Sequence, residues 1–487
     1  MVSLFGSIKL KAVIDKEKNR VILAESEEGF IDVLLSFLTM PMGTIIRLTR
    51  SQLPSIGCMN NLYASVENLD VRRFRTQACK EMLLHPLNGA ATHCNYLKLK
   101  IDNTTENLRY LYCGDSECVA SKHKLFSHYS SSFCGCGKPM NYSLNQLSNA
   151  ESNNIVVSDP RDEGVFVRGL TRLIISDELQ LMPPSATASF SLLAKHGVMD
   201  AKTMEERTFD VQVNEVLNLL KSTLVSKRPL TETLLKQQQM PEPRKEDLGV
   251  DWFIKQKIGE HATEGDRKIC VRLVLSKSKK MVCYAEAAED FVDLLFSFLA
   301  IPLGFIVKEM RGYPSKGCIT HLYDSVEELD TEKYFKSNDH KETLLCPKMA
   351  SRFGYKNQLI GVEEVNRQYY LSGDYPCIFT HKPTNRKFST LTMNDPKAPL
   401  YKEQAISNGG FVLGPETFTV TDDLRVTPIS PVLHLSVLSK LKVPFSDIEE
   451  RIVHVGNEEA LRLLVASFIS ESALTDTFTP KRLEQEY

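Results

Sequence analysis

Four cysteines that lie close together in the chain are the side chains best suited to chemistry. Cys113, Cys118, Cys134 and Cys136 occupy a 24-residue window with the spacing C-x4-C-x15-C-x-C. Zn²⁺ binds four thiolates in a tetrahedron, and the glycines beside Cys134 and Cys136 let backbone amides approach the sulfur atoms. The window predicts a structural zinc site, because four thiolate ligands leave no open coordination position for catalysis.

Two other interpretations of the cysteines stay open on spacing alone. Structural zinc sites prefer about two to four residues between paired ligands, so His123 or His128 could replace one cysteine. The window could also be a loop of ordinary reduced thiols. The third alternative, a redox-active disulfide, predicts thiol loss under mild oxidant and no bound metal.

The elements that must position these cysteines belong to a sequence that repeats itself. The segment 30–43 recurs as 291–304, with eight of the 14 positions identical and most others exchanging one apolar residue for another. A period this long indicates a domain-sized duplication rather than a solenoid. Further pairs in the same register are Gly57-Cys58 with Gly317-Cys318, Leu62-Tyr63 with Leu322-Tyr323, Ser176-Asp177 with Thr421-Asp422, and Leu230-Thr231 with Leu474-Thr475.

This duplication predicts two tandem pseudo-repeats joined by a connector. The connector contains Gln237-Gln238-Gln239, Pro241, Pro243 and a charge-rich run, which are typical of linkers. In the second repeat only Cys377 survives from the cysteine cluster, so zinc would be needed once per chain. The predicted division is a first repeat at 1–225 with a Cys-rich insertion at 113–140, a linker at 226–268, and a second repeat at 269–487 in which the insertion is degenerate.

Each repeat begins with the same expected elements. Apolar residues alternate at 8–14 and return at 21–24 after a polar turn, which predicts a β-hairpin, and 269–285 predicts its counterpart. A helix should follow, because Phe30, Val33, Leu34, Phe37 and Leu38 fall on one apolar stripe. Pro41 and Gly43 are expected to close this helix.

Each repeat should end in a second hairpin followed by helices. Acidic turns separate the apolar segments that form these hairpins. Because strands and helices are intermixed without a βαβ rhythm, we predict the α+β class. The expected late elements are hairpins at 173–182 and 418–426, helices at 215–224 and 459–468, and shorter helices at 191–195 and 436–440.

Polar residues retained in both repeats are further candidates for chemistry. Glu25 and Glu286, between hairpin and helix, are interpreted as capping or turn carboxylates. Asp32 and Ser36 lie one helical turn apart and could meet a ligand together, but a solvated or hydrogen-bonded polar stripe opposite the core face is the preferred interpretation. Glu25 and Glu286 also carry the alternative hypothesis, an enzyme that uses carboxylates in a groove between the repeats.

The remaining matched residues favour structure over catalysis. Asp177 and Asp422 fall in the turns of expected hairpins, where aspartate hydrogen-bonds nearby backbone amides. Cys58 and Cys318 follow glycine near a helix start, which can lower a thiol pKa, yet small buried cysteines are the preferred interpretation. No histidine occupies equivalent positions in both repeats, which weakens any Cys/His or Ser/His nucleophile.

The composition excludes several classes of protein. Lys plus Arg number 59 against 61 Asp plus Glu, so no strong field steers nucleic acid to the chain. The N-terminus lacks the features of a secretory signal, and no stretch is apolar enough to cross a bilayer. We expect a soluble, intracellular and cytoplasmic protein whose 12 cysteines are mostly reduced. The motifs GxGxxG, GxSxG, HExxH and the phosphate loop are all missing.

Several short motifs along the chain can be compared with known families. They are Lys9 to Asp15, Asn19-Arg20-Val21, Ala24-Glu25, Phe30 to Arg47, Ser55 to Cys58, Asn61-Leu62-Tyr63, Ser65-Val66, and the knuckle, which is the segment from Cys134 to Met140. Together these motifs resemble the plant family known as domain of unknown function 674. The resemblance covers nearly the whole chain, twice over, and implies a repeated module with no established activity and no catalytic residues. In that family the knuckle is richer in paired cysteines, whereas here Cys134 and Cys136 form a C-x-C pair.

These observations predict a non-catalytic binding or scaffold protein. Two pseudo-symmetric modules, the first pinned by structural zinc, would present a surface or groove to a protein or small ligand, without nucleic acid and without membrane insertion. Two similar modules can also pack together as identical subunits do. An enclosed pocket containing matched carboxylates would favour the enzyme, and an exposed apolar patch would favour binding.

Overall fold

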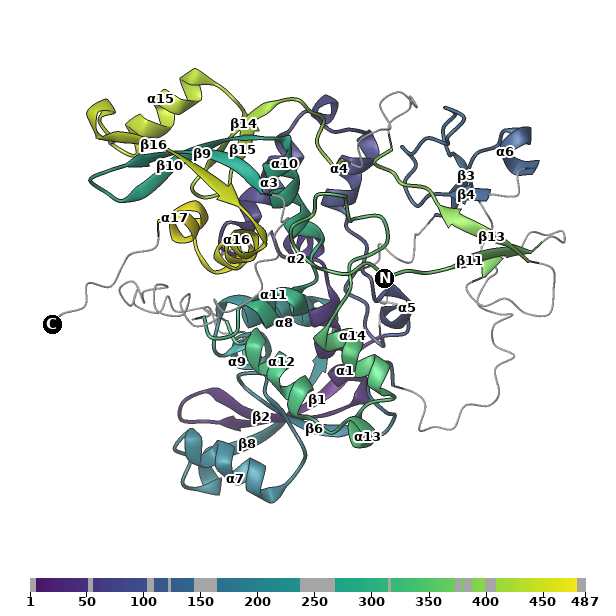
Figure 1. The fold of residues 1–487 in the computed structure, drawn as a ribbon. Helices are drawn as coiled ribbons and strands as arrows, with labels where there is room; N and C mark the ends of the chain where they lie inside the picture. Colours follow the sequence, from purple (N-terminus) through teal and green to yellow (C-terminus); the bar gives the residue numbers. More distant parts are fainter. Residues whose placement is uncertain are drawn as a thin grey trace.

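The chain has a mixed α+β fold, drawn in Figure 1 from a computed structural model. The described residues contain 17 α-helices and four β-sheets, which confirms the predicted α+β class. Most of the predicted linker, at 237–267, lies outside them. The structure describes residues 6–50, 56–102, 109–120, 124–143, 164–236, 268–313, 317–372, 379–380, 388–398 and 409–479.

The first sheet has five antiparallel strands in the order β7-β6-β2-β1-β8. The predicted hairpin at 8–24 forms its centre, where Leu10 and Ala12 are fully buried and alternate with solvent-facing residues. The expected hairpin at 173–182 adds two more strands. The bounds are β1 Ile8–Asp15, β2 Arg20–Glu27, β6 Arg172–Ser176, β7 Leu181–Met182 and β8 Met204–Val211.

The second sheet has the order β15-β14-β10-β9-β16, which is the order of the first sheet when corresponding strands are compared. It is also antiparallel throughout. Its central hairpin shifts register between Val282 and Tyr284, as the first hairpin does between Val13 and Ile14. The bounds are β9 Ile269–Ser276, β10 Met281–Ala288, β14 Thr417–Thr421, β15 Val426–Pro428 and β16 Ile448–Val455.

The helix after each central hairpin is buried on every side. Helix α1 (Glu28–Ser36) tightens into the 3₁₀ turn η1 (Phe37–Thr39), and the next helix, α2, begins at Met42. The expectation that Pro41 and Gly43 close the first helix is therefore wrong in detail, because Pro41 is the N-cap of α2 and Gly43 lies inside it. Gly43 is needed there, since a Cβ would lie 3.0 Å from the carbonyl oxygen of Leu83.

Most of the remaining helices have a counterpart at a similar place in the other half of the chain, although among the described residues α5 has none and α13 corresponds to the 3₁₀ turn Val71–Arg73. Those expected at 191–195, 215–224, 436–440 and 459–468 are all present as α7, α8, α15 and α16. The bounds are α2 Met42–Thr49, α3 Met59–Asn68, α4 Gln77–Leu84, α5 Ala91–Cys94, α7 Ala186–Lys195, α8 Val213–Val225, α9 Pro229–Leu234, α10 Glu289–Ser297, α11 Leu303–Glu309, α12 Ile319–Glu328, α13 Thr331–Tyr334, α14 Asn338–Leu345, α15 Pro431–Lys440, α16 Asn457–Ile469 and α17 Ala473–Phe478.

Two helices pack against the sheet that is distant from them in sequence. Helix α3 contacts β15 and α10 of the second sheet region, whereas α12 contacts β7 of the first sheet. Figure 1 shows this arrangement, with α3 beside the upper sheet and α12 beside the lower one. The predicted domain limits stay a prediction, but packing crosses them in both directions.

The two insertions meet in a smaller sheet with the order β12-β11-β13-β4. Strand β4, close to the cysteine cluster, pairs in parallel with β13 from the second half of the chain. A separate apolar cluster, which includes Phe126 and Leu391, holds this sheet together. The bounds are β3 Leu111–Tyr112, α6 Ser116–Ala120, β4 Lys124–Phe126, β5 Tyr142–Ser143, β11 Tyr369–Ser372, β12 Phe379–Thr380 and β13 Phe388–Met393.

One continuous apolar core runs through both large sheets and the helices between them. Phe37 and Leu38 from the first half belong to the same cluster as Phe298 and Leu299 from the second, and all four are fully buried. In the part of the chain that the structure describes, no helix has the length and apolar composition needed to span a bilayer.

Candidate metal centre

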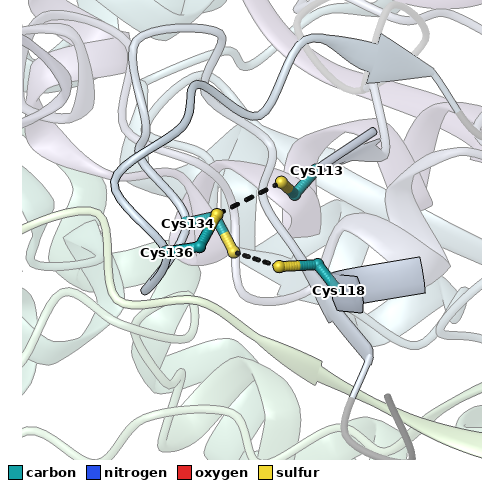
Figure 2. A group of neighbouring side chains, drawn as sticks. All are labelled: Cys113, Cys118, Cys134 and Cys136. Atoms are coloured by element: carbon teal, nitrogen blue, oxygen red, sulfur yellow. Dashed lines mark hydrogen bonds between the residues drawn. The ribbon is translucent and has the colours of Figure 1, made fainter. Parts of the chain in front are cut away.

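The four predicted cysteines converge in space. Figure 2 shows their side chains directed toward a common centre. The Sγ atoms of Cys113 and Cys136 lie 3.6 Å apart, those of Cys118 and Cys134 lie 3.7 Å apart, and all four sulfur atoms are within 4.8 Å of one another. The structure thus brings together residues that are up to 23 positions apart in the sequence.

Three short elements position these thiols. Cys113 follows strand β3, Cys118 lies in helix α6, and the other two cysteines occupy a tight turn. In this turn the Gly137 amide donates to the Cys134 carbonyl at 2.8 Å, and the Cys134 amide donates to the Lys138 carbonyl at 2.9 Å. Gly137 has φ +84°, a conformation that glycine adopts without the penalty of a side chain. The positive φ angle of this turn therefore explains why glycine stands at position 137 of the predicted knuckle.

The surroundings of the four thiols are partly apolar and partly charged. Cys113 and Cys134 are buried together with Leu111 and Met140, whereas Cys136 is exposed. The backbone amide of Lys138 lowers the pKa of the Cys136 thiol, and burial raises that of Cys113. Cys136 is accordingly the easier of these two thiols to deprotonate.

The sulfur geometry suits a tetrahedral metal ion. A Zn–S bond of about 2.3 Å places the sulfur atoms of a regular tetrahedron about 3.8 Å apart. The two shorter Sγ–Sγ separations, 3.6 and 3.7 Å, agree with this value, whereas a disulfide requires about 2.05 Å. The cluster can therefore bind a metal such as zinc, and its four thiols are free cysteines.

The structure does not bring a histidine into this cluster among the residues that it describes. The Nδ1 atom of His128 lies 3.0 Å from the Arg109 carbonyl oxygen, and its ring packs edge-on against Tyr110. His123 and the second-repeat Cys377 lie outside the described residues. The alternative in which His128 replaces a cysteine finds no support in this arrangement.

Asp32 and Asp293 do not belong to a solvated stripe. Asp32 is buried and accepts hydrogen bonds from the amides of Val165, Phe166 and Val167 at 2.6 to 3.0 Å. Asp293 accepts from Phe411 and Val412 in the same way. Sequence reasoning left open a solvated or a hydrogen-bonded role, and the structure selects the latter.

The pKa values of these two carboxyls report the balance between burial and hydrogen bonding. Burial raises the pKa of Asp32 to about 6, although three backbone amides act in the opposite direction. Burial raises the pKa of Asp293 to about 7, where only two amides oppose it. Because the amides come from a chain segment more than a hundred residues away, each carboxyl fixes a distant loop onto the helix after the central hairpin.

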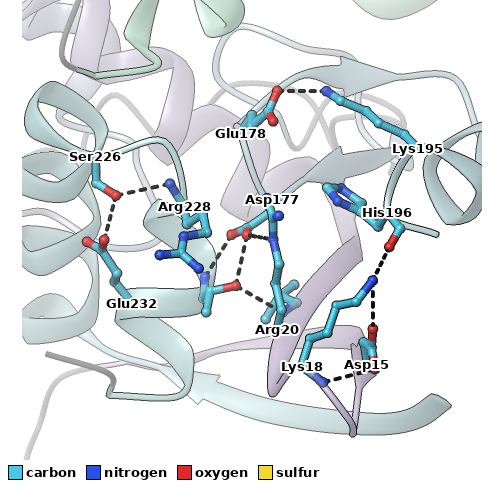
Figure 3. Close-up of polar contacts among 12 residues, drawn as sticks. Asp15, Lys18, Arg20, Asp177, Glu178, Lys195, His196, Ser226, Arg228 and Glu232 are labelled. Carbon is cyan, nitrogen blue, oxygen red and sulfur yellow. Dashed lines mark hydrogen bonds and ion pairs between the residues drawn. The ribbon is translucent and has the colours of Figure 1, made fainter. Parts of the chain in front are cut away.

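Asp177 and Asp422 anchor C-terminal helices rather than their own turns. Asp177 accepts from the Thr231 amide and hydroxyl, both at 2.9 Å, and from Arg20 Nε at 2.9 Å, as Figure 3 shows. Asp422 accepts from Thr475 at 2.7 and 2.8 Å. The turn interpretation missed these partners. A signal was present, because the two threonines are themselves a matched pair of the repeat.

Glu25 and Glu286 lie within strands rather than at caps, which corrects their expected position. Glu25 is exposed on β2 opposite Lys11. Glu286 is half-buried on β10, 3.6 Å from Arg272 and 3.8 Å from a nitrogen of His434. They belong to different sheets.

Neither the matched thiols nor the hollow beside Arg352 resembles a catalytic site. Cys58 and Cys318 are fully buried, and burial raises the pKa of Cys58 to about 12. A shallow hollow lined by Arg352, Glu364 and Lys397 contains none of the carboxylates retained in both halves. This hollow therefore gives no support to the alternative of a catalytic groove.

Comparison with known proteins yields one family. A family model described as "Protein of unknown function (DUF674)" matches residues 6–458, nearly the whole chain. No curated protein and no solved structure matches the chain significantly. The comparisons therefore assign the chain to a family but transfer no activity to it.

Proposed function

We propose that this chain, which belongs to the DUF674 family, is a non-catalytic binding or scaffold protein. Its partner would be another protein, bound through solvent-exposed apolar side chains of helices α7 and α15, which we call the outer helices. A structural zinc ion would complete the insertion of the first half. Two observations support this proposal. Apolar side chains are exposed at equivalent positions of both halves, and the matched aspartates are occupied by hydrogen bonds that hold the fold.

The observation that carries the proposal is an exposed apolar residue at one position of both outer helices. Phe190 on α7 is 68% exposed, and Leu435 at the equivalent position of α15 is 55% exposed. Each helix also packs against a sheet, through Leu192 on the first sheet and Leu438 on the second. Single exposed apolar residues are ordinary, but large apolar residues at matched positions are a feature that folding alone does not need.

Neighbouring side chains extend both surfaces. Met199, just after α7, is 93% exposed, and Val432 on α15 is 77% exposed. Exposed apolar side chains of this kind contribute to binding when a partner removes their surface from water. We define the outer patch as Phe190 and Met199 on the first half with Val432 and Leu435 on the second.

The enzyme alternative has less support. Asp32, Asp293, Asp177 and Asp422 are all occupied by hydrogen bonds that fix distant segments of the chain. Glu25 is exposed on a strand, and a hydrolytic or proton-transfer site would need such a group beside a substrate cavity. These carboxylates therefore favour architecture over catalysis.

The zinc proposal rests on the four sulfur atoms and their separations. Cys113, Cys118, Cys134 and Cys136 would supply a complete tetrahedral shell, which is typical of structural sites. Metal binding would offset the entropy of ordering a segment that contains only short strands and one short helix. The absence of disulfides among the described cysteines supports a reducing, intracellular compartment.

We further propose that the two halves arose by duplication. The identical order of corresponding strands in the two large sheets supports this origin. So do the matched roles of Asp32 with Asp293 and of Asp177 with Asp422. The halves would then form a pseudo-dimer that presents two similar outer surfaces.

The binding proposal is tested by altering the outer patch without altering the core. Phe190→Ser combined with Leu435→Ser removes the matched side chains, and Ser191→Ala combined with Ser436→Ala is the control on the same helices. Both proteins are used for quantitative affinity capture from an extract of the source cells. Proteins that depend on the patch are purified and titrated against each variant.

We expect at least one captured protein to bind the control normally and the patch variant about tenfold more weakly or worse, since an interface anchor contributes about 1.4 kcal/mol or more. Equal binding by both variants would contradict a patch-mediated function. Turnover of a small molecule that Glu25→Gln or Glu286→Gln abolishes would instead establish the enzyme.

A further inference from the structure

The two halves contact each other through equivalent residues at one point. Pro41 pairs with Pro302 in an antiparallel bridge. The Met42 amide donates to the Ile301 carbonyl at 3.1 Å, and the Leu303 amide donates to the Met40 carbonyl at 2.9 Å. A contact in which each residue meets its own counterpart is the signature of a local two-fold axis.

Beyond this contact, each half contributes helices that pack against the sheet of the other half. The Val426 amide of the second sheet donates to Ser65 Oγ on α3 at 2.9 Å. Its counterpart is the Leu181 amide of the first sheet, which donates to Ser325 Oγ on α12 at the same distance. The reciprocity extends to the helix starts, where the amides of Cys58 and Cys318 donate to carbonyls of α16 and α8 respectively.

The segments that follow these helices are exchanged as well. Phe74 bridges to Val412, and Phe335 bridges to Val167. The loops at 165–167 and 411–412 are the same loops that Asp32 and Asp293 hold by their amides. Each half therefore fixes a loop with its own aspartate and then uses that loop to bind a strand-like segment of the other half.

The exchanged helices are part of the core rather than a surface addition. Leu62 and Val66 on α3 are fully buried, as are Leu322 and Val326 on α12. If either half were alone, these side chains and the sheet residues beneath them would be exposed to water. The loss of that burial would destabilise each half, because apolar side chains stabilise a fold in proportion to the area that they remove from water.

We propose that the two halves form an obligate pair, which means that neither half folds stably without the other. In this pair the helical segment 59–84 of the first half covers the second sheet, and the helical segment 319–345 of the second half covers the first sheet. Each sheet binds the helical segment that the other half contributes. The halves then remain bound to each other after the chain between them is cut. This proposal depends on the cross-half contacts alone, so it is independent of the outer patch, of zinc and of the origin by duplication.

The first test cuts the folded, full-length protein. A protease site is inserted between Lys245 and Glu246, between α9 and β9 in sequence, and the protein is cleaved after purification. We expect native mass spectrometry to find both fragments in one 1:1 complex. Unfolding in urea should occur in one transition whose midpoint rises with protein concentration after cleavage, but not before it. Fragments that separate under native conditions, or that unfold in two independent transitions, would overturn the proposal.

The second test asks whether the helices cover the sheet of the other half or whether the two halves merely pack side by side. It uses the uncut protein. Ser65→Ala removes the acceptor of the Val426 amide, and Ser325→Ala removes that of the Leu181 amide. We expect Ser65→Ala to accelerate hydrogen exchange of the second sheet about tenfold around Val426 and to leave Leu181 unchanged. Ser325→Ala should do the converse. Acceleration confined to the sheet of the same half in either variant would overturn the exchanged arrangement.

Discussion

The two large sheets resemble each other more closely than the two insertions do. Asp293 does in the second half what Asp32 does in the first, and Asp422 meets Thr475 as Asp177 meets Thr231. The cysteine cluster, by contrast, lies in the first half alone among the described residues. Side chains that hold the backbone of a sheet region thus occur twice, whereas the metal-binding set occurs once and serves one insertion.

A finer contrast lies within the matched pairs themselves. Arg20 reaches Asp177, but Met281 stands at the corresponding position of the second hairpin, so Asp422 has no such partner. Asp32 receives three backbone amides and Asp293 receives two. Among the described residues, the buried carboxylates of the first half therefore accept more hydrogen bonds, and variants at these positions should have unequal effects in the two halves.

The largest expected effect concerns the cysteines. Cys134→Ser combined with Cys136→Ser removes two of four ligands, and apparent free energies of structural zinc binding reach about 10 kcal/mol or more. Hydrogen exchange should then show that β3, β4 and β5 lose their protection while β14 keeps it. Cys270→Ser, an exposed cysteine on β9, is the control and should change neither. Unchanged protection of β4 would show that the insertion does not depend on metal.

The next effect separates the two buried aspartates of the hairpin turns. Asp177→Ala leaves Arg20 and Thr231 without their partner, and we expect a loss of about 3 to 5 kcal/mol in the free energy of unfolding. Asp422→Ala leaves only Thr475, and the expected loss is about 1 to 3 kcal/mol. Urea denaturation of both variants measures the difference. A larger loss for Asp422→Ala would contradict the assigned role of Arg20.

A smaller effect is a dependence of stability on pH. The pKa values of Asp32, Asp293 and Asp422, at about 6, 7 and 6, lie above the usual value of the unfolded chain, so the folded protein binds more protons between pH 4 and 7. Stability from these groups is present at low pH and is lost as the pH rises through the folded pKa. We expect unfolding to cost about 3 kcal/mol more at pH 5.5 than at pH 8.

Single variants locate the source of this pH dependence. Asp293→Asn should remove about half of the difference, because its carboxyl has the highest of the three pKa values. Asp32→Asn should remove less. Denaturant titrations at the two pH values measure both. Aspartate variants whose dependence on pH equals that of the unaltered protein would show that these carboxyls keep ordinary pKa values when folded.

The smallest effects belong to the strand glutamates. Glu25→Gln should change the free energy of unfolding by less than about 0.5 kcal/mol, since the side chain is exposed. Glu286→Gln should cost slightly more, because Glu286 lies near Arg272 and His434. Thermal denaturation of the two variants checks this order. A large loss of stability for Glu25→Gln would reveal a role in the fold that the described contacts do not include.

Local sequence patterns predicted the elements better than their packing. The alternation at 8–14 and the repeated motif at 30–43 indicated the central hairpins and the helices after them, because strand and helix periods are local properties. The cysteine window indicated the candidate metal centre, because its four cysteines are close to one another in the sequence. Pro41 misled the prediction, since its ring is as acceptable at the first turn of a new helix as after the end of an old one.

The long-range partners were beyond such patterns. Nothing local to Asp177 indicates that Thr231 lies beside it, and nothing local to Ser65 indicates that it meets the opposite sheet. These contacts depend on how the whole chain is threaded, which periodicity does not encode. Matched pairs between the two repeats were the one sequence signal that pointed to them.

The zinc content of the protein tests most directly the claim that the first half carries a structural metal that the second half lacks. Freshly purified protein and the variant Cys134→Ser with Cys136→Ser are compared by elemental analysis and thiol titration under native conditions. We predict about one zinc per chain, with its four cysteine thiols protected from reagent, and no zinc in the variant. Metal-free protein with all four thiols reactive would contradict this account.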